Sequence, residues 1–393
     1  MKRTLWWALL VLAVLAIGYL GVGLVVAERL SAPSHQPQKL TPTEAGLDYR
    51  EVKIQSTDRL ELAGWWVPGD VHSRAVVLVS GIEGDKSDRH VVETASVYAG
   101  AGYGVLMIDL RAQGSSEGER VTMGYKEVRD VRGALLWLNE RGFAPGEVVL
   151  HGFSLGGATV LRAAPQSGVA AVVEESAYSD LPLILRQQLP EVSGLPSFFI
   201  PGIFVMGKLF LGIDPWAVRP ERDARKLCEE GIPLLIIHST DDETMPFEHA
   251  RRIKAACPEA TLWRIEGYEH VGAYAHPEYR QSILDFLRTK VFTGETRRRS
   301  QPSAHPYLRE RGTVQRYERQ RQQGTSRLRL GASQAHTGEE GLLAEEEDLA
   351  RGDIPETGFV MVRESASITD HRTLETISAN VPGNGRVAHR RLP

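Results

Sequence analysis

The regular alternation of short apolar runs with amphipathic helical stretches between residues 48 and 292 constrains the fold of this chain more than any other feature. Runs rich in valine, isoleucine and leucine that are separated by helices are typical of a parallel sheet covered on both faces, because parallel strands need long crossover connections. The runs predicted to be strands are residues 51–55, 60–67, 75–80, 103–110, 147–151, 169–174, 233–239 and 260–266. The clearest helical stretches are residues 89–98, 125–139, 155–164, 247–256 and 277–289. The first two strands follow each other directly, so we predict an α/β fold with a mostly parallel eight-stranded sheet that starts antiparallel and carries helices on both faces.

An apolar segment without a charged residue occupies residues 4–27, directly after Lys2 and Arg3. It is long enough to cross the hydrocarbon core of a bilayer, which requires about 20 residues. A cleavable signal peptide would have a shorter apolar region of about 7–15 residues and a small-residue cleavage site, so residues 1–27 are predicted to be an uncleaved transmembrane anchor. The positive charges before the segment place the N-terminus in the cytoplasm and the rest of the chain on the extracytoplasmic side of the cell membrane.

Three further segments lie outside the alternation. Residues 28–47 contain three prolines and are predicted to be a linker that lifts the following domain off the membrane. Residues 176–228 contain an apolar run at 195–213 that prolines interrupt, which predicts a cap over the carboxyl edge of the sheet. A second membrane span is the alternative for this run, and it fails if residues on both sides of the run build one site. Residues 293–393 lack aliphatic periodicity, so they are predicted to be a disordered tail.

The composition implies no metal, no cofactor and no nucleic-acid partner. The formal net charge is −4, and the arginine-rich part of the tail has few interleaved aromatic residues. The two cysteines, Cys228 and Cys257, are too few for a disulfide framework and belong to no zinc-binding or redox motif. One bridge between them is the alternative, whereas two unpaired apolar side chains are the favoured interpretation.

The sequence GFSLG at residues 152–156 matches the G-x-S-x-G pattern around Ser154. The pattern alone is weak in a chain with 38 glycines. However, it lies between a predicted strand and a predicted helix, which is the context of a nucleophilic serine on a sharp turn. Glycines are needed on both sides because the strand and helix backbones approach each other closely there. A phosphate-binding turn, the alternative, would contain G-x-G-x-x-G or a lysine beside the second glycine, and neither is present.

A serine hydroxyl is a weak nucleophile until a histidine accepts its proton and a carboxylate orients the histidine. In this architecture both partners are expected at the carboxyl ends of later strands, with the acid before the histidine. The loop after the strand at 233–239 holds the candidate acids Asp241, Asp242 and Glu243. Chemistry alone allows each of the three to orient the imidazole.

His270 lies in the loop after the last predicted strand and is the favoured base because of that position. The competing histidines are His238, His276 and His151. The last of these is adjacent to the serine turn but lies within a strand, where a hydrogen bond in the core is the favoured role.

The oxyanion that forms during acyl transfer needs two backbone N–H donors. Leu155, directly after the serine, is expected to supply the first. Ile82, in the loop 80–85 after the third predicted strand, is expected to supply the second.

On these residues the chain resembles the α/β-hydrolase superfamily, and more narrowly the membrane-anchored bacterial serine hydrolases with a short cap. The resemblance covers about residues 48–292. Ser80-Gly81 stands where the family usually has His-Gly, and DLRAQGSS at residues 109–116 stands where it has D-x-R-G-x-G-x-S. The turn GFSLGG at residues 152–157 matches the family's nucleophile turn.

The resemblance also selects between the candidate partners of Ser154. The segment HSTDDETMP at residues 238–246 is similar to the family's H-G-x-x-D-x-x-V-P, and that register points to Asp242. The segment EGYEH at residues 266–270 is similar to the turn that carries the family's histidine, so the resemblance implies His270. Ser80 and Ser239 depart from the pattern, and neither departure removes one of the three residues.

Together these features predict a serine hydrolase in which Ser154, His270 and Asp242 cleave an ester, thioester or amide bond. A carboxylesterase or lipase-like activity on a small-molecule or lipid acyl substrate is preferred, because the predicted cap is apolar and nothing in the chain resembles a propeller or an acidic site for a peptide amine. A serine peptidase of the same fold and a non-catalytic, membrane-tethered scaffold are the alternatives.

Overall fold

The structure is a computed structural model, and it describes residues 2–70 and 74–292. The predicted tail, residues 293–393, lies outside the described residues. In chain order the main elements are α1 (Lys2–Leu30), β1 (Arg50–Gln55), β2 (Glu61–Val67), β3 (Ala75–Val79), α2 (Arg89–Ala99), β4 (Gly104–Ile108), α3 (Val128–Asn139), β5 (Val148–Phe153), α4 (Leu155–Ala163), β6 (Ala171–Glu175), α5 (Leu181–Ser193), α6 (Ile200–Phe210), α7 (Pro220–Glu229), β7 (Leu234–Ser239), α8 (Glu248–Ala256), β8 (Thr261–Ile265) and α9 (Tyr279–Phe286).

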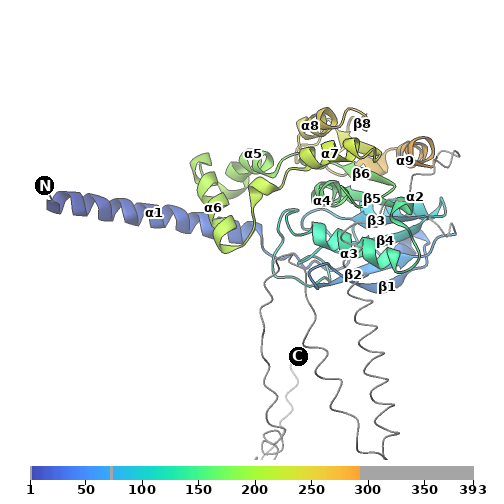
Figure 1. The fold of residues 1–393 in the computed structure, drawn as a ribbon, viewed down its shortest axis with the longest axis horizontal. Helices are drawn as coiled ribbons and strands as arrows, with labels where there is room; N and C mark the ends of the chain where they lie inside the picture. The colour runs from blue at the N-terminus through green and yellow to red at the C-terminus, as the bar shows by residue number, and fades with distance from the viewer. Residues whose placement is uncertain (1, 71–73, 293–393) are drawn as a thin grey trace, which may run out of the picture. The chain divides into compact units, whose positions relative to one another are not determined.

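The eight strands form one sheet in the order β1-β2-β4-β3-β5-β6-β7-β8 (Figure 1). β1 pairs antiparallel with β2, and β2 pairs antiparallel with β4. The remaining neighbours run parallel to each other. The predicted eight-stranded, mostly parallel sheet with an antiparallel start is therefore confirmed.

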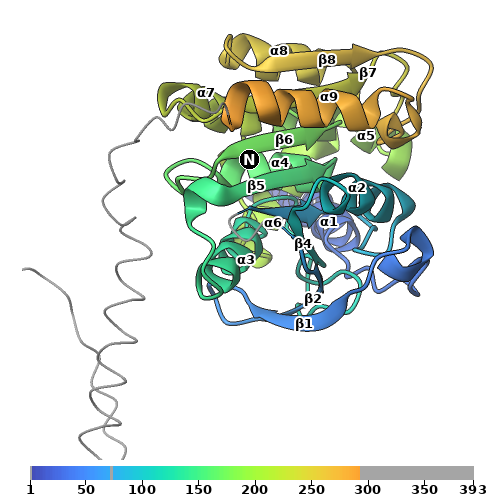
Figure 2. The same ribbon diagram turned by 90° about the vertical axis from the view of Figure 1, so that its right-hand side faces the viewer.

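Helices cover both faces of the sheet, and each face has its own apolar core (Figure 2). On β3, Val77 and Val79 belong to the core that contains residues of α3, α4, α7 and α8, whereas Val76 and Leu78 belong to the core that contains residues of α2 and α9. The central strands β3 to β6 are buried at every residue because both of their faces are covered. This double burial explains why these strands appear in the sequence as nearly unbroken apolar runs.

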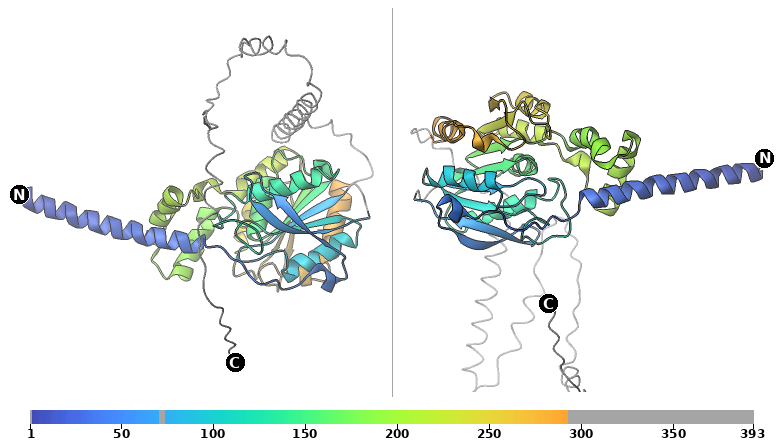
Figure 3. Two further views of the ribbon diagram at one scale, coloured as in Figure 1. Left: turned by 90° about the horizontal axis from the view of Figure 1, so that it is seen from below. Right: turned by 180° about the vertical axis from the view of Figure 1, so that it is seen from behind.

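α1 is long and apolar enough to cross a membrane. Its N-terminal half lies clear of the domain, and its C-terminal part contacts α6 (Figures 1 and 3). The segment after α1 is not the detached spacer that the prolines predict. The Ser34 N–H donates to the carbonyl of Ala112 at 2.8 Å, and the Lys39 N–H donates to the Ser87 hydroxyl at 2.9 Å, so this segment lies on the domain.

The predicted cap consists of α5, a short 3-10 helix η3 (Ser197–Phe199) and α6, whereas α7 joins one of the two main cores. The apolar run at 195–213 forms η3 and α6. α6 has 11 residues, and at about 1.5 Å per residue it is much shorter than a bilayer core of about 30 Å. A third, smaller core around Ala27, Ile203 and Phe204 joins α6 to α1.

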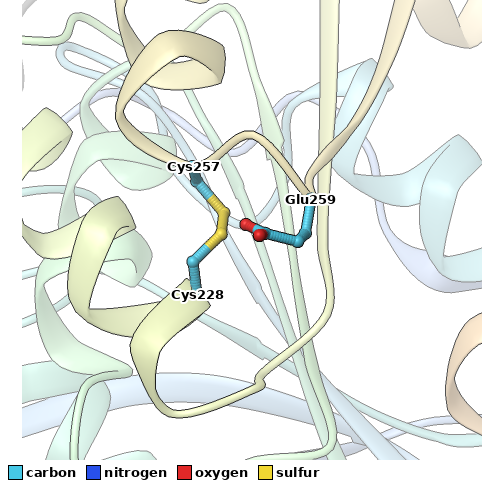
Figure 4. Close-up of side chains that lie close together, drawn as sticks. All are labelled: Cys228, Cys257 and Glu259. Atoms are coloured by element: carbon cyan, nitrogen blue, oxygen red, sulfur yellow. A yellow bond between two sulfur atoms is a disulfide. The ribbon is translucent and has the colours of Figure 1, made fainter.

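Cys228, at the end of α7, and Cys257, just after α8, form a disulfide with a Cα–Cα distance of 5.5 Å (Figure 4). The expectation of two unpaired cysteines is therefore wrong. The bridge forms because α7 and α8 lie side by side and bring together two residues that are 29 positions apart. Glu259 lies close to the two sulfur atoms, but both sulfurs are bonded to each other in this state.

Candidate active site

Ser154 occupies the turn between β5 and α4 with φ 53° and ψ −116°, a backbone conformation that costs energy for any residue with a side chain. The strand and helix backbones meet here so closely that a Cβ atom on Gly152 would lie 2.3 Å from the carbonyl oxygen of Gly156. A Cβ atom on Gly156 would lie 2.2 Å from the carbonyl oxygen of Val79 on β3. The two glycines of the pattern are therefore required by backbone contact.

The structure brings Ser154, His270 and Asp242 together in one chain of hydrogen bonds. The Nε2 atom of His270 lies 2.9 Å from the Ser154 Oγ atom, and its Nδ1 atom lies 2.8 Å from Oδ2 of Asp242. A carboxylate can only accept, so it favours the tautomer with the proton on Nδ1. Nε2 is then left unprotonated and accepts the hydrogen bond of the serine hydroxyl.

The loop after β7 presents only one of its three acids to the histidine. Asp242 is buried, and its Oδ1 atom accepts the Met245 N–H at 2.7 Å. Burial acts to raise the pKa of Asp242, but the hydrogen bond and electrostatic attraction from His270, together with the hydrogen bond from the Met245 N–H, outweigh it and hold the pKa below its ordinary value. Asp241 is exposed and accepts the Gly267 N–H at 2.7 Å, and Glu243 is exposed.

The competing histidines have partners of their own away from Ser154. Nε2 of His238 donates to the carbonyl of Met245 at 2.7 Å, and burial lowers the pKa of His238. His151 lies 3.1 Å from the Tyr98 hydroxyl in the core, where burial lowers the pKa of the imidazole to about 3. His276 is half-buried, and its Nδ1 atom accepts the backbone N–H two residues further on at 3.0 Å.

Two backbone segments border the serine. Gly81 lies so close that a Cβ atom on it would be 3.1 Å from the Cβ and 3.7 Å from the Oγ of Ser154, and Ile82 is the next residue. Leu155 begins α4 directly after the serine. Within residues 2–70 and 74–292, the N–H groups of Ile82 and Leu155 have no hydrogen-bond acceptor.

The loop that carries Ile82 is held by Asp88, whose importance the sequence did not indicate. One of its oxygens accepts the Ser80 hydroxyl at 2.8 Å and the Asp85 N–H at 3.0 Å, and the other accepts the Lys39 ammonium at 2.5 Å. Burial acts to raise the pKa of Asp88, but the hydrogen bonds from Lys39 and Ser80 keep it lowered. Ser80, which replaces the family's usual histidine, thus anchors the loop.

Glu175 is a second residue that sequence reasoning missed. It ends β6, and its carbonyl oxygen accepts the Ser154 N–H at 2.8 Å. Its buried carboxyl group contacts the Ala273 N–H at 3.1 Å, in the loop after His270, and the Tyr279 hydroxyl at 3.2 Å. Burial raises the pKa of Glu175 to about 8. The only sequence signal is a pair of acids at the end of an apolar strand.

A known family and several known proteins match parts of this chain. A model of the X-Pro dipeptidyl-peptidase (S15) family matches residues 35–191, which is less than half of the chain. An uncharacterised protein of Mycobacterium tuberculosis is 27% identical over 53% of this chain and 68% of its own length. An uncharacterised membrane protein of Saccharomyces cerevisiae is 25% identical over 64% of this chain and 84% of its own length.

Solved structures share the fold. An esterase of Pyrococcus furiosus superposes with a TM-score of 0.54 at 22% identity and covers 67% of this chain and 98% of its own. An α/β hydrolase of a Penicillium species, GrgF, superposes with a TM-score of 0.51 at 19% identity and covers 62% of this chain and 99% of its own. These likenesses, together with the sheet order, show that the chain has the α/β-hydrolase fold, and the partial match to the X-Pro dipeptidyl-peptidase family supports a hydrolase of this fold.

Proposed function

We propose that the protein is a membrane-anchored serine hydrolase that cleaves carboxylic esters through an acyl-enzyme intermediate. The observation that carries this proposal is the hydrogen-bonded chain from Ser154 through His270 to Asp242, at 2.9 and 2.8 Å, on a strained turn. An arrangement maintained at this cost in backbone strain is expected to have a chemical use.

In the proposed reaction, Oγ of Ser154 attacks the ester carbonyl carbon while its proton moves to Nε2 of His270. The carbonyl oxygen becomes negative and accepts hydrogen bonds from the N–H groups of Leu155 and Ile82. Asp242 stabilises the imidazolium, which then protonates the leaving alcohol as the carbon–oxygen bond breaks. Water, deprotonated by His270, attacks the acyl-serine, and the carboxylic acid leaves as Ser154 regains its proton.

The apolar surroundings of the cap support an ester with an acyl chain. A small cavity at the junction of α1, α5 and α6 is lined mainly by apolar side chains, among them Leu30, Leu185, Ile203 and Phe204. Its lining does not include Ser154, so the preference for an ester rests on the apolar character of the cap and not on this cavity. A serine peptidase is the second candidate because of the partial match to the X-Pro dipeptidyl-peptidase family.

A fluorophosphonate probe tests the proposed nucleophile in the full chain purified in detergent. We expect the protein to be labelled and Ser154→Ala to remain unlabelled with an unchanged unfolding transition. Labelling of the alanine variant at the original level, or an unlabelled parent protein, would contradict the proposal and favour the non-catalytic scaffold. Comparison of kcat/KM for p-nitrophenyl esters with that for X-Pro p-nitroanilides separates the esterase from the peptidase.

The proposed topology has the N-terminus in the cytoplasm and the hydrolase domain outside. The charges of Lys2 and Arg3 before the apolar segment support it. The disulfide between Cys228 and Cys257 also supports it, because such bonds persist in oxidising compartments and are rare in the cytosol. Protease added to intact cells or spheroplasts is expected to digest the domain, and full protection there would overturn this orientation.

A further inference from the structure

The exposed apolar side chains of the domain gather on the cap, next to α1. Outside α1, the described residues with large exposed apolar side chains are Ile82, Val192, Phe198, Val205, Leu209 and Phe210. All except Ile82 lie on α5, η3 and α6, and their exposed fractions run from 38% to 73%. Single exposed apolar residues are ordinary on a protein surface, but a concentration of them on one short segment indicates a partner.

α6 contacts the part of α1 that precedes the hydrolase domain (Figure 3). The Tyr19 ring stacks on Phe199 with a centroid distance of 5.3 Å. The two helix backbones touch at glycines, since a Cβ atom on Gly23 would lie 2.8 Å from the carbonyl carbon of Gly202. Close backbone contact through small residues is typical of helix pairs inside membranes, where apolar side chains have no reason to prefer each other to lipid.

The contacts between α6 and α1 indicate how deep α6 would lie in a membrane that α1 crosses. Gly207, near the end of α6, lies beside Ala27, where the uncharged segment ends, whereas Gly202 lies beside Tyr19. Tyr19 precedes Ala27 by about eight residues, which corresponds to roughly 12 Å along the helix axis. If α1 crosses the bilayer, the start of α6 therefore lies roughly 12 Å inside the end of the apolar segment.

The backbone at the start of α6 has partners there that do not depend on water. The Tyr19 hydroxyl donates to the carbonyl of Phe198 at 2.8 Å and accepts the Gly202 N–H at 3.0 Å. Pro201, between them, has no N–H group. An unsatisfied backbone group in hydrocarbon costs several kcal/mol, so this tyrosine meets the need of a helix start that lies within lipid. Lys208, nearer the outer end, pairs with Asp214 at 2.7 Å.

We propose that the tip of the cap, residues 192–210, is inserted into the outer leaflet of the membrane beside α1, so that its exposed apolar side chains contact lipid acyl chains. The inference rests on the proposed transmembrane anchor and is independent of the chemistry at Ser154. It makes the cap a second membrane contact of the hydrolase domain, whose tip reaches slightly deeper than the about 5–10 Å that is typical of interfacial helices.

Site-directed fluorescence of the full chain in phosphatidylcholine vesicles tests this proposal. Single cysteines replace Phe198 and Phe210 and carry an NBD label, with the native disulfide left intact by omitting reductant. Leu12→Cys in α1 serves as the control for the span, and Glu140→Cys, at the exposed end of α3, serves as the aqueous control. All four replaced side chains are exposed to solvent in the structure, so none of them contributes to a core.

We expect phosphatidylcholine with brominated acyl chains to quench the labels at 198 and 210 at least threefold more than the label at 140. Iodide dissolved in the water should quench the label at 140 more than the labels at 198 and 210. If the label at 12 is quenched by the lipid and both cap labels behave like the label at 140, the cap proposal is wrong and the anchor stands. If the label at 12 is not quenched either, the anchor is wrong and the cap proposal falls with it. Fluorophosphonate labelling in the same vesicles reports separately on the proposed hydrolase.

Discussion

Asp242→Asn removes one acceptor from the hydrogen-bonded chain and leaves the shape of the side chain almost unchanged. In the structure Oδ1 of Asp242 accepts the Met245 N–H at 2.7 Å and Oδ2 accepts Nδ1–H of His270 at 2.8 Å. Asparagine has a single oxygen, and if this oxygen keeps the Met245 bond, the amide NH₂ faces Nδ1. The imidazole must then carry its proton on Nε2, which points at the Oγ of Ser154 and can no longer accept the serine proton.

The expected loss in kcat/KM is about 10³- to 10⁴-fold, because a carboxylate that only orients a histidine and stabilises its charge contributes on this scale. At about 1.36 kcal/mol per tenfold change, this loss corresponds to roughly 4–5.5 kcal/mol. The assay is hydrolysis of p-nitrophenyl butyrate by the full chain in detergent. Asp241→Asn is the matched control, since Asp241 is the neighbouring acid and accepts the Gly267 N–H instead. The reasoning is refuted if the Asp242 variant keeps more than a tenth of the parent kcat/KM, or if the Asp241 variant loses as much.

Three further predictions concern the surroundings of the site. The unfolding free energy of the parent protein should fall as pH rises from about 4.5 to about 8, because the folded Glu175 carboxyl keeps its proton up to a pKa of about 8 whereas the unfolded one loses it near its ordinary value of 4.5. Glu175→Gln should make this fall smaller. If urea unfolding shows the same change in unfolding free energy between pH 5 and pH 8 for parent and variant, the prediction is wrong. Cys228→Ser should lower the unfolding free energy by about 3.5 kcal/mol, because it removes a disulfide between residues 29 positions apart. If reductant leaves the denaturation midpoint of the parent protein unchanged, the prediction is wrong. Gly156→Ala should abolish fluorophosphonate labelling and lower the unfolding free energy by about 3 kcal/mol or more, since its Cβ would lie 2.2 Å from the Val79 carbonyl oxygen. Gly146→Ala is the control, because the nearest atom to its Cβ is 3.9 Å away, and it should change neither labelling nor stability.

The sheet was predictable from the sequence because its central strands are buried on both faces. The run at 147–151 corresponds to β5 (Val148–Phe153), and the helical stretch at 125–139 corresponds to α3 (Val128–Asn139). Local signals of this kind set each element within a few residues. The turn at Ser154 was found for the same reason, since a strand, two glycines and a helix follow each other without a gap. The catalytic roles of Ser154, Asp242 and His270 stay predictions.

Features that depend on contacts between distant segments were not predictable. Asp241 and Asp242 are chemically alike and adjacent, so the residue types alone do not show which of them faces His270, and only the register of the family pattern pointed to Asp242. The disulfide of Cys228 depends on the side-by-side placement of α7 and α8. Glu175 gained its contacts from the position of β6 between the serine turn and the loop that carries the histidine, which the sequence of β6 does not encode.

The contacts between α1 and the rest of the chain have a consequence for access to the candidate site. A free linker of about 17 residues would let the domain move by roughly 20–25 Å relative to its anchor. Instead, the segment after α1 is attached to the domain, since Ser34 forms an isolated β-bridge with Gln113 in the loop at the carboxyl end of β4. The cap makes a second connection, because α5 starts just after the carboxyl end of β6 and leads to α6, which contacts α1. Because Ser154 lies at this same edge of the sheet, at the end of β5, the edge that carries the candidate site is held on the side of α1. In the proposed membrane-anchored enzyme the site would therefore stay at a nearly fixed height above the lipid, which favours substrates that are presented at the membrane surface over those that must diffuse to a freely tumbling domain.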